Sequence, residues 1–259
     1  MGEHTDPVTP QMASPSFRLP ALDQDYLLGD STRGVRFMLE YSKAEEILRK
    51  WRVKSTIVVF GSARARLDGG GNSGRWYQMA REFGSLASRK GGALKGEAGE
   101  DDLNNVIATG GGPGIMEAAN RGADEAGAPT IGFNITLPHE QEPNSYSTPD
   151  LTFNFHYFAM RKMHLAMRAS ALVVFPGGFG TMDELFELLT LIQTEKMPEI
   201  PIVLVDQAYW TSIVNFRTLA EHGMINEEDL DLFDFADDAD AVWQKLIGRG
   251  LAVLGAFPV

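Results

Sequence analysis

The sequence contains no cysteine, so the chain can form neither disulfide bonds nor thiolate metal sites. A chain without disulfides suits a reducing compartment, and we expect it to work in the cytoplasm. The sequence has no run of about 18 consecutive apolar residues, so we expect no membrane-spanning helix. Its first residues are polar and acidic rather than basic and then apolar, so we expect no signal peptide there.

Basic residues are also scarce, since Lys and Arg total 23 against 35 Asp and Glu, a net charge of −12. A nucleic-acid surface needs clustered cations, so we expect no nucleic-acid partner. Any anionic ligand must be held by local features rather than by the overall field of the protein. The five histidines show no H-E-x-x-H or comparable ligand spacing, and we expect no metal site.

What the sequence does contain is a large apolar share, 44% of its residues, in short runs that alternate with amphipathic stretches. The apolar runs predict strands at 55–60, 105–109, 129–135, 171–175 and 200–205, and the short stretch 151–155, which alternates in polarity, predicts another. The amphipathic stretches predict helices at 74–89, 157–168, 209–222 and 241–247 and directly after residues 114 and 180. This alternation predicts an α/β protein: a Rossmann-like doubly wound parallel sheet with helices on both faces.

The two ends of the chain differ in composition from this alternating region. Residues 1–30 are expected to be disordered or loosely packed. Residues 31–259 are expected to form a single Rossmann-like domain with an N-terminal helical extension. The acidic stretch 227–240 is expected to be a solvated face.

Three of the predicted strands end in loops that contain glycine, at residues 61–64, 110–114 and 176–180. The carboxyl ends of parallel strands meet at one edge of a sheet, so these loops should converge on one ligand crevice. The loop 110–114 can also be interpreted as a tight turn packed against a neighbour. Residues 69–74 match G-x-G-x-x-G but follow no strand directly, and we interpret them as a mobile loop.

The loop 176–180 leads into a helix that Thr181 is predicted to open. Backbone N–H groups at such a helix start favour an anion. The loop has no lysine, so it is not a nucleoside-triphosphate loop. Glu184, one turn into the helix, has two interpretations: it forms a capping box with Thr181, or it is a functional carboxylate. The spacing leaves both open.

Two adjacent cations, Arg161 and Lys162, lie in the first turns of the helix before this strand. The helix dipole disfavours a cation there by about 0.3–1 kcal/mol. Either both are exposed toward the acidic surface, or an anion compensates them. Beside the glycine loop, Arg161 would give a phosphate and a sugar a place close to Glu184.

These motifs together, Gly110–Ala119, Met160-Arg161-Lys162 and the run from Pro176 to Glu184, resemble the "lonely guy" family over residues 55–222. That family comprises cytokinin-activating phosphoribohydrolases, long mislabelled as possible lysine decarboxylases. The N-terminal extension and the loop 91–102 are similar to its longer bacterial-type branch.

The resemblance implies site residues. It makes Arg161 and Glu184 the catalytic pair and places the 5′-phosphate on the loop 177–181, with Lys162 nearby. Asp183 stands where the family more often has glutamate, and residues 158–160 depart from its commoner Met-His-x. The predicted substrate-binding residues are Gly61, Ser62, Gly111, Gly112, Gly114, Glu140, Met160, Lys162, Gly177, Gly178, Gly180, Thr181 and Asp183.

The expected function is therefore hydrolysis of a purine nucleoside 5′-monophosphate, AMP or its N6-prenylated cytokinin relative, to free base and ribose 5-phosphate. A carboxylate that stabilises an oxocarbenium-like sugar and activates water suits this reaction. No cofactor is expected, and the resemblance implies a homodimer or a dimer of dimers. The alternative is a binding module without turnover, a nucleotide sensor or molybdenum-cofactor carrier. A pyridoxal-phosphate decarboxylase is a third interpretation, but the glycine loops lack its lysine.

Overall fold

The structure, a computed structural model, describes residues 9–94, 102–137 and 142–253. The chain divides into two compact units, Met1–Lys43 and Ala44–Val259. The helices of the first unit are α1 (Pro10–Ala13), α2 (Gln24–Leu28) and the first part of α3 (Arg33–Lys50). Within it, Arg36 Nη1 donates to the carbonyls of Leu27 and Gly29 at 2.7 Å. The predicted boundary at residue 30 and the loose packing of residues 1–30 stay predictions.

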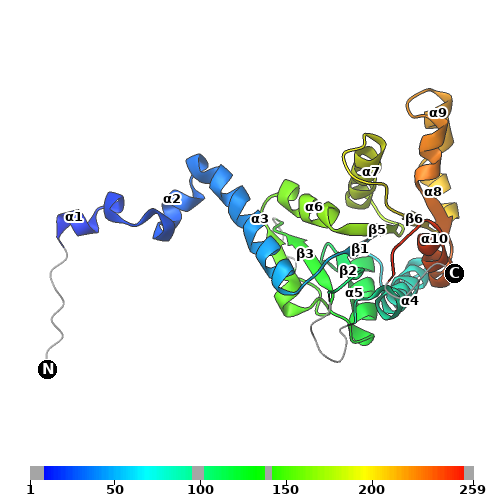
Figure 1. Ribbon diagram of the computed structural model, residues 1–259, viewed down its shortest axis with the longest axis horizontal. Helices are drawn as coiled ribbons and strands as arrows, with labels where there is room; N and C mark the ends of the chain where they lie inside the picture. Colours follow the sequence, from blue (N-terminus) through cyan, green and yellow to red (C-terminus); the bar gives the residue numbers. More distant parts are fainter. Residues whose placement is uncertain (1–8, 95–101, 138–141, 254–259) are drawn as a thin grey trace. The chain divides into compact units, whose positions relative to one another are not determined.

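The second unit is built on a seven-stranded sheet with the order β4-β3-β2-β1-β5-β6-β7, and every pairing is parallel (Figure 1). The strands are β1 (Thr56–Phe60), β2 (Val106–Thr109), β3 (Ile131–Ile135), β4 (Thr152–Phe155), β5 (Ala169–Val174), β6 (Ile202–Val205) and β7 (Asp234–Ala236). The helices are α4 (Ser73–Gly91), α5 (Ile115–Glu125), α6 (Phe158–Met167), α7 (Phe179–Gln193), α8 (Gln207–Ile213), α9 (Phe216–Glu221) and α10 (Ala239–Gly248). This confirms the predicted Rossmann-like fold.

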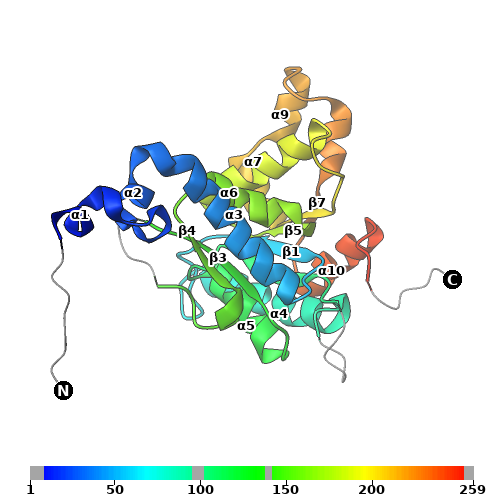
Figure 2. The ribbon, with the colours of Figure 1, turned by 60° about the vertical axis from the view of Figure 1, so that its left-hand side comes forward.

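Helices cover both faces of the sheet (Figures 1 and 2). The central strand β1 alternates between two cores, because successive side chains of a strand point to opposite faces. Ile57 and Val59 join the core formed with α4, α5 and α10. Val58 and Phe60 join the core formed with α6 and α7. Both faces of β1 are buried, which explains its continuous apolar sequence.

Two features of the C-terminal part differ from the prediction. Most acidic residues of 227–240 are exposed, as expected of a solvated face, but the stretch also contains the edge strand β7, and Asp234 in it binds Arg249 and Lys245. The predicted helix 209–222 is two helices. Val214 is extended between them, and the Asn215 side chain caps α9 by accepting the N–H of Thr218 at 3.1 Å.

No helix in the described ranges is both long and apolar enough to span a bilayer.

The C-terminal part of α3 belongs to the second unit, and the buried carboxylate of Glu45 binds it to Arg168. Arg168 Nη2 and Nη1 lie 3.0 and 2.8 Å from its two oxygens, and Arg49 Nε lies 2.5 Å away. The hydrogen bond from Arg168 is the largest cause that lowers the pKa of Glu45 to about 2, although burial opposes it. A carboxylate whose pKa is lower in the folded than in the unfolded chain stabilises the folded state. This contribution is complete at a pH above the unfolded pKa, and it is lost as the pH falls toward the folded pKa of about 2.

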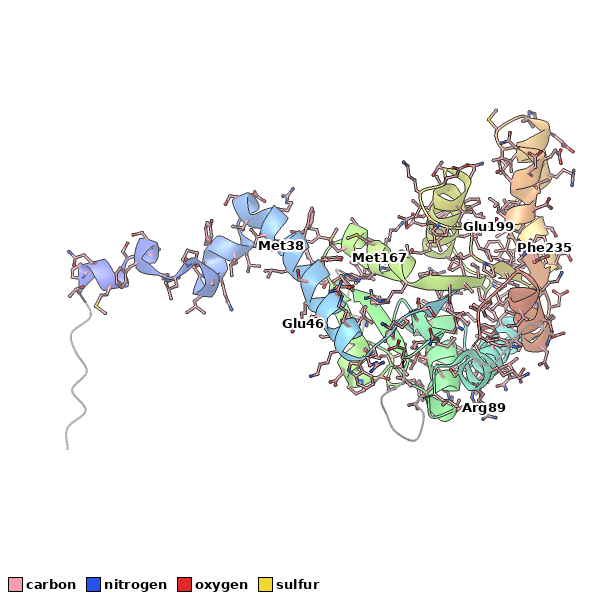
Figure 3. The ribbon with its side chains drawn as sticks, in the orientation of Figure 1. Met38, Glu46, Arg89, Met167, Glu199 and Phe235 are labelled. Carbon is pink, nitrogen blue, oxygen red and sulfur yellow. The ribbon has the colours of Figure 1, made fainter. Side chains whose placement is uncertain are left out.

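We therefore expect Glu45→Gln to lower the free energy of unfolding by about 3 kcal/mol near neutral pH. The deficit should shrink as the pH is lowered below about 4.5. Urea denaturation at several pH values measures it. The matched control is Glu46→Gln, since Glu46 is the exposed neighbour (Figure 3). Equal losses in the two variants would contradict the role of this ion pair.

Candidate active site

The loops that follow β1 and β5 face each other at one edge of the sheet. The strand order reverses here, because β2, β3 and β4 continue on one side of β1 and β5, β6 and β7 on the other. Ser62, after β1, donates its backbone N–H to the carbonyl of Pro176, after β5, at 2.9 Å. Open α/β sheets bind ligands at this switch point.

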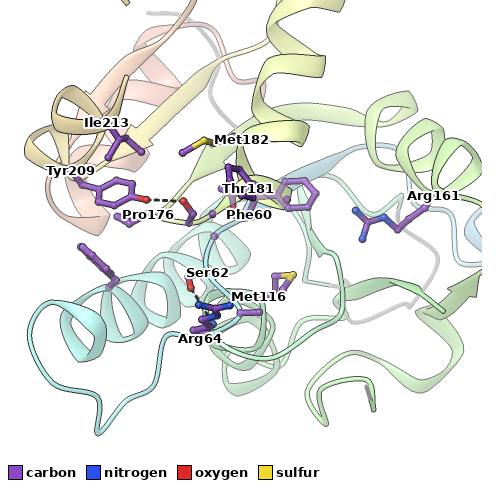
Figure 4. Close-up of a pocket in the computed structure, with 17 residues that line it drawn as sticks. Phe60, Ser62, Arg64, Met116, Arg161, Pro176, Thr181, Met182, Tyr209 and Ile213 are labelled. Atoms are coloured by element: carbon purple, nitrogen blue, oxygen red, sulfur yellow. Dashed lines mark hydrogen bonds between the residues drawn. The ribbon is translucent and has the colours of Figure 1, made fainter. Parts of the chain in front are cut away.

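A cavity of about 670 Å³, here called the main pocket, lies between these loops (Figure 4). Its size is within the range of small-molecule sites, about 300–1,000 Å³. The predicted site residues that line it are Gly61, Ser62, Arg161, Gly177, Gly178, Gly180 and Thr181. The structure thus brings the β1 loop, the β5 loop and α6 together.

The N-terminus of α7 points into the main pocket. The helix begins at Phe179, two residues before the predicted start, and Gly178 is its N-cap. The Gly178 carbonyl accepts the N–H groups of Thr181 and Met182, both at 3.0 Å. The first N–H groups, those of Phe179 and Gly180, have no acceptor within a helix. Both residues line the pocket, so the helix start offers N–H groups and a favourable dipole to an anion.

Glycine serves a different purpose at different positions of this loop. A Cβ at Gly177 would lie 2.1 Å from Oγ1 of Thr181, so only glycine lets the helix start close on the loop. A Cβ at Gly178 or Gly180 would meet no described atom within 4 Å. Both of these positions line the pocket, so a ligand can approach their backbone closely.

Arg161 and Glu184 come together at one end of the main pocket. Arg161 Nη2 donates to Glu184 Oε1. The Glu184 side chain is only 1% exposed, and the Arg161 side chain is 11% exposed. The capping interpretation of Glu184 is wrong, because Gly178 caps α7 and the carboxylate binds the arginine. A helix rises about 1.5 Å per residue, so Glu184 lies about 6 Å from Gly180 along the axis of α7.

The pair has unused hydrogen-bonding capacity. Among the described residues, Nε of Arg161 and Oε2 of Glu184 have no partner although both atoms are buried. Burial is the largest influence on the pKa of Glu184 and raises it, against the lowering effect of the charges of Arg161 and Lys162. Arg161 belongs to the lining of the pocket, whereas Glu184, to which it donates, does not. Unsatisfied buried groups with a shifted pKa are typical of functional sites.

Lys162 and Asp183 bind each other rather than the main pocket. Lys162 Nζ lies 2.8 Å from Asp183 Oδ2 and 2.7 Å from Glu187 Oε2, both on α7. Burial would lower the pKa of Lys162, but these two carboxylates outweigh it and the pKa is raised. Neither Lys162 nor Asp183 belongs to the described lining of the main pocket. Their predicted contact with substrate stays a prediction.

The glycines after β2 are held in packing contacts. A Cβ at Gly114 would lie 2.3 Å from the carbonyl oxygen of Ser62, and Gly111 has a φ of +70° with Asn134 against it. Asn144 donates its backbone N–H to the Gly111 carbonyl at 2.8 Å and its side-chain amide to the Gly112 carbonyl at 3.1 Å. These contacts support the tight-turn interpretation, and substrate binding by Gly111, Gly112 and Gly114 stays a prediction.

Two further predicted residues lie elsewhere. Met160 packs, partly buried, against the core on the α6 and α7 face. Glu140 lies outside the described residues. Their predicted roles therefore stay predictions.

The lining residues that the sequence interpretation missed include Arg64, Trp76 and Tyr209. Arg64 had a usable signal, because it lies in the same strand-end loop as Gly61 and Ser62. Trp76 and Tyr209 had none, since each looked like one apolar position of an amphipathic helix.

The fold and the pocket define a Rossmann-like α/β protein with a ligand crevice that combines a helix N-terminus and a buried Arg–Glu pair. The family model described as "Possible lysine decarboxylase" matches residues 116–246, about half of the chain, and the chain belongs to this family.

Curated relatives confirm the resemblance to the lonely guy family. The chain is 26% identical over 146 residues to LOG4 of Oryza sativa subsp. japonica, a "probable cytokinin riboside 5′-monophosphate phosphoribohydrolase", covering 55% of this chain and 62% of the relative. It is 25% identical over 146 residues to the cytokinin riboside 5′-monophosphate phosphoribohydrolase LOG3 of Arabidopsis thaliana, covering 55% and 66%. The match thus spans less than two thirds of the length of either relative.

A solved structure shares the fold. The X-ray structure of TM1055, a Northeast Structural Genomics Consortium target, superposes with a TM-score of 0.52 at 20% identity. The superposition covers 75% of this chain and 99% of that one. At this identity the likeness concerns the fold alone.

Proposed function

We propose that the protein hydrolyses the N-glycosidic bond of a purine nucleoside 5′-monophosphate, AMP or a cytokinin riboside monophosphate, to free base and ribose 5-phosphate. The observation that carries the proposal is the buried Arg161–Glu184 pair about 6 Å along α7 from an anion-binding helix start. That spacing suits a ribose 5-phosphate, with its phosphate at Phe179 and Gly180 and its C1′ beside the pair. The names of the curated relatives support the same reaction.

In the proposed reaction, water adds to C1′ while the C1′–N bond breaks. The bonding electrons leave with the base nitrogen, which takes up a proton. The Glu184 carboxylate stabilises the oxocarbenium-like sugar and accepts a proton from the water. Arg161 binds this carboxylate, so it moves aside when substrate enters, and its charge-assisted hydrogen bonds then orient the sugar.

A decarboxylase function has less support, despite the family description. A pyridoxal-phosphate enzyme needs a lysine for its Schiff base, with a lowered pKa. None of the described residues that line the main pocket is a lysine. Lys162 is bound by Asp183 and Glu187, and its pKa is raised. The residues therefore do not fit that cofactor.

The expected result with AMP and with isopentenyladenosine monophosphate is release of free base, measured by chromatography of the reaction mixture. Adenosine is the matched control substrate, because it lacks the phosphate that the α7 N-terminus would hold. Binding of AMP without base release would reject the hydrolase and favour the alternative, a nucleotide sensor or molybdenum-cofactor carrier. The proposed assembly, a homodimer or dimer of dimers, is tested by light scattering on the same preparation.

A further inference from the structure

The main pocket continues past the N-terminus of α7 to a second end that the proposed reaction does not use. Arg161 lies at one side of the close-up, Tyr209 and Ile213 lie at the other, and Thr181 and Pro176 lie between them (Figure 4). Trp76 lines the pocket as well. In the proposed function C1′ lies beside Arg161 and the phosphate lies at the helix start. The end formed by Trp76, Tyr209 and Ile213 is then on the side of the phosphate that faces away from the sugar. We call these three residues the aromatic end.

The aromatic end is held rigidly by Asp206, at the end of β6. Asp206 is buried and has a φ of +70°, a left-handed conformation that is uncommon for residues other than glycine. Its Oδ2 accepts the Trp76 Nε1–H at 2.8 Å, and its Oδ1 accepts the Tyr209 backbone N–H at 3.0 Å. The two rings meet edge to face, with centroids 5.7 Å apart. One buried carboxylate thus holds the Trp76 ring and the start of α8, which carries Tyr209.

The aromatic end is also tied to the phosphate loop. The Tyr209 hydroxyl donates to the carbonyl of Gly177 at 2.7 Å. A polar tip that is satisfied in this way leaves the ring itself as an apolar wall. The aromatic end and the helix start therefore form one continuous surface.

A second arginine lines the main pocket, Arg64, which lies beside Ser62 and Met116 (Figure 4). Among the described residues its guanidinium has no hydrogen-bond or ion-pair partner, since the hydrogen bond of Arg64 to Ser62 is donated by its backbone N–H. The neighbouring Arg66 differs, since its Nη1 donates to the carbonyls of Ala63 and Ala65. In a chain with a net charge of −12, a free guanidinium in a pocket is suited to an anion.

We propose that the site takes nucleotides whose 5′-phosphate carries a second phosphate and a further ring, such as a dinucleotide. The first phosphate lies at the α7 N-terminus, the second meets Arg64, and the far ring stacks on the aromatic end. This rests on the proposed function for the placement of C1′. Hydrolysis of such a substrate breaks the same C1′–N bond, with the water oxygen on C1′ and a proton on the departing base, and leaves the diphosphate intact.

The test compares AMP, ADP and di(adenosine-5′) diphosphate, which adds first a phosphate and then a ring. Calorimetric titration uses the Glu184→Gln variant, so that no ligand is consumed. We expect di(adenosine-5′) diphosphate to bind about tenfold more tightly than ADP, through stacking on the aromatic end. Trp76→Leu should remove this difference, while Trp76→Phe should keep part of it. Arg64→Gln should remove the preference for ADP over AMP.

Matched controls are Trp51→Leu, a half-buried tryptophan outside the main pocket, and Arg75→Gln, whose Nη2 donates to the Asp237 carbonyl. Thermal melting shows whether each variant folds. Equal affinity for all three ligands, or equal weakening of all three by Trp76→Leu, would overturn the inference.

The two proposals fail separately. If the wild type releases adenine from AMP but binds the dinucleotide no better than ADP, the hydrolase stands and the second subsite falls. A Trp76-dependent preference without adenine release from any ligand would leave the subsite standing and reject the hydrolase.

Discussion

Glu184→Gln is expected to lower the rate of base release from AMP by about a thousandfold, within the range that a positioned acid–base group supplies. Glutamine keeps the shape of the side chain and can still accept from Arg161, but it cannot stabilise a cationic sugar or take a proton. Nucleotide binding should be largely kept, because the phosphate is held by the start of α7. Single-turnover chromatography measures the rate, and calorimetry with AMP measures the binding.

The control for this variant is Glu187→Gln, since Glu187 lies on the same helix and binds Lys162 outside the main pocket. It should retain most of the activity. The pH profile gives a second check: burial raises the pKa of Glu184, so its ionised form predominates only above the ordinary range of a glutamate. Activity should therefore fall on the acid side at a higher pH than an exposed glutamate would give. A Glu184→Gln variant with wild-type turnover would remove Glu184 from the mechanism.

Arg161→Met is expected to cost about 3–5 kcal/mol of unfolding free energy, because it leaves a buried carboxylate without its partner. The double variant Arg161→Met with Glu184→Leu should recover much of this stability, since it buries no charge at all. Neither variant should release base. Urea denaturation of the wild type, both single variants and the double variant forms a thermodynamic cycle that isolates the pair.

The stability deficit of Arg161→Met should also depend on pH. Without the arginine, the pKa of the buried Glu184 rises further above its value in the unfolded chain. A carboxyl with a raised pKa favours the folded state at low pH and disfavours it as the pH increases. The deficit should therefore be larger at pH 8 than at pH 5. A deficit that is independent of pH, or a double variant as unstable as the single one, would mean that the pair is not coupled.

The sequence predicted the parts of the fold that depend on local pattern. Six predicted strands are present, because most of them are buried apolar runs between turn signals and the edge strand β4 alternates in polarity. The strand β7 was missed because three residues within an acidic stretch carry too little pattern, and its pairing to β6 is a tertiary contact. The break between α8 and α9 was missed because the apolar spacing continues across Asn215.

The sequence also indicated the Arg161–Glu184 pair, through the position of Arg161 beside the glycine loop and through the family resemblance, which made the two the catalytic pair. Spacing alone could not choose between a capping glutamate and a functional one, because that depends on where α7 begins. Because α7 starts at Phe179, Glu184 lies too far along the helix to cap it. This start depends on the close fit of Thr181 against Gly177. The family resemblance placed Lys162 near the phosphate, and the sequence does not tell which way its side chain turns. Its partners, Asp183 and Glu187, lie on the next helix and become visible only in three dimensions.

The position of β1 in the middle of the sheet has a consequence for how the protein is made. Thr56 pairs with Val106 on one side and with Ala169 on the other, so its second neighbour leaves the ribosome much later. Pairings between distant residues are slow to form, and until then β1 has an open apolar edge that can aggregate. The two walls of the pocket therefore meet only when nascent β5 docks, so a ribosome that stalls before Ala169 holds a chain without the crevice.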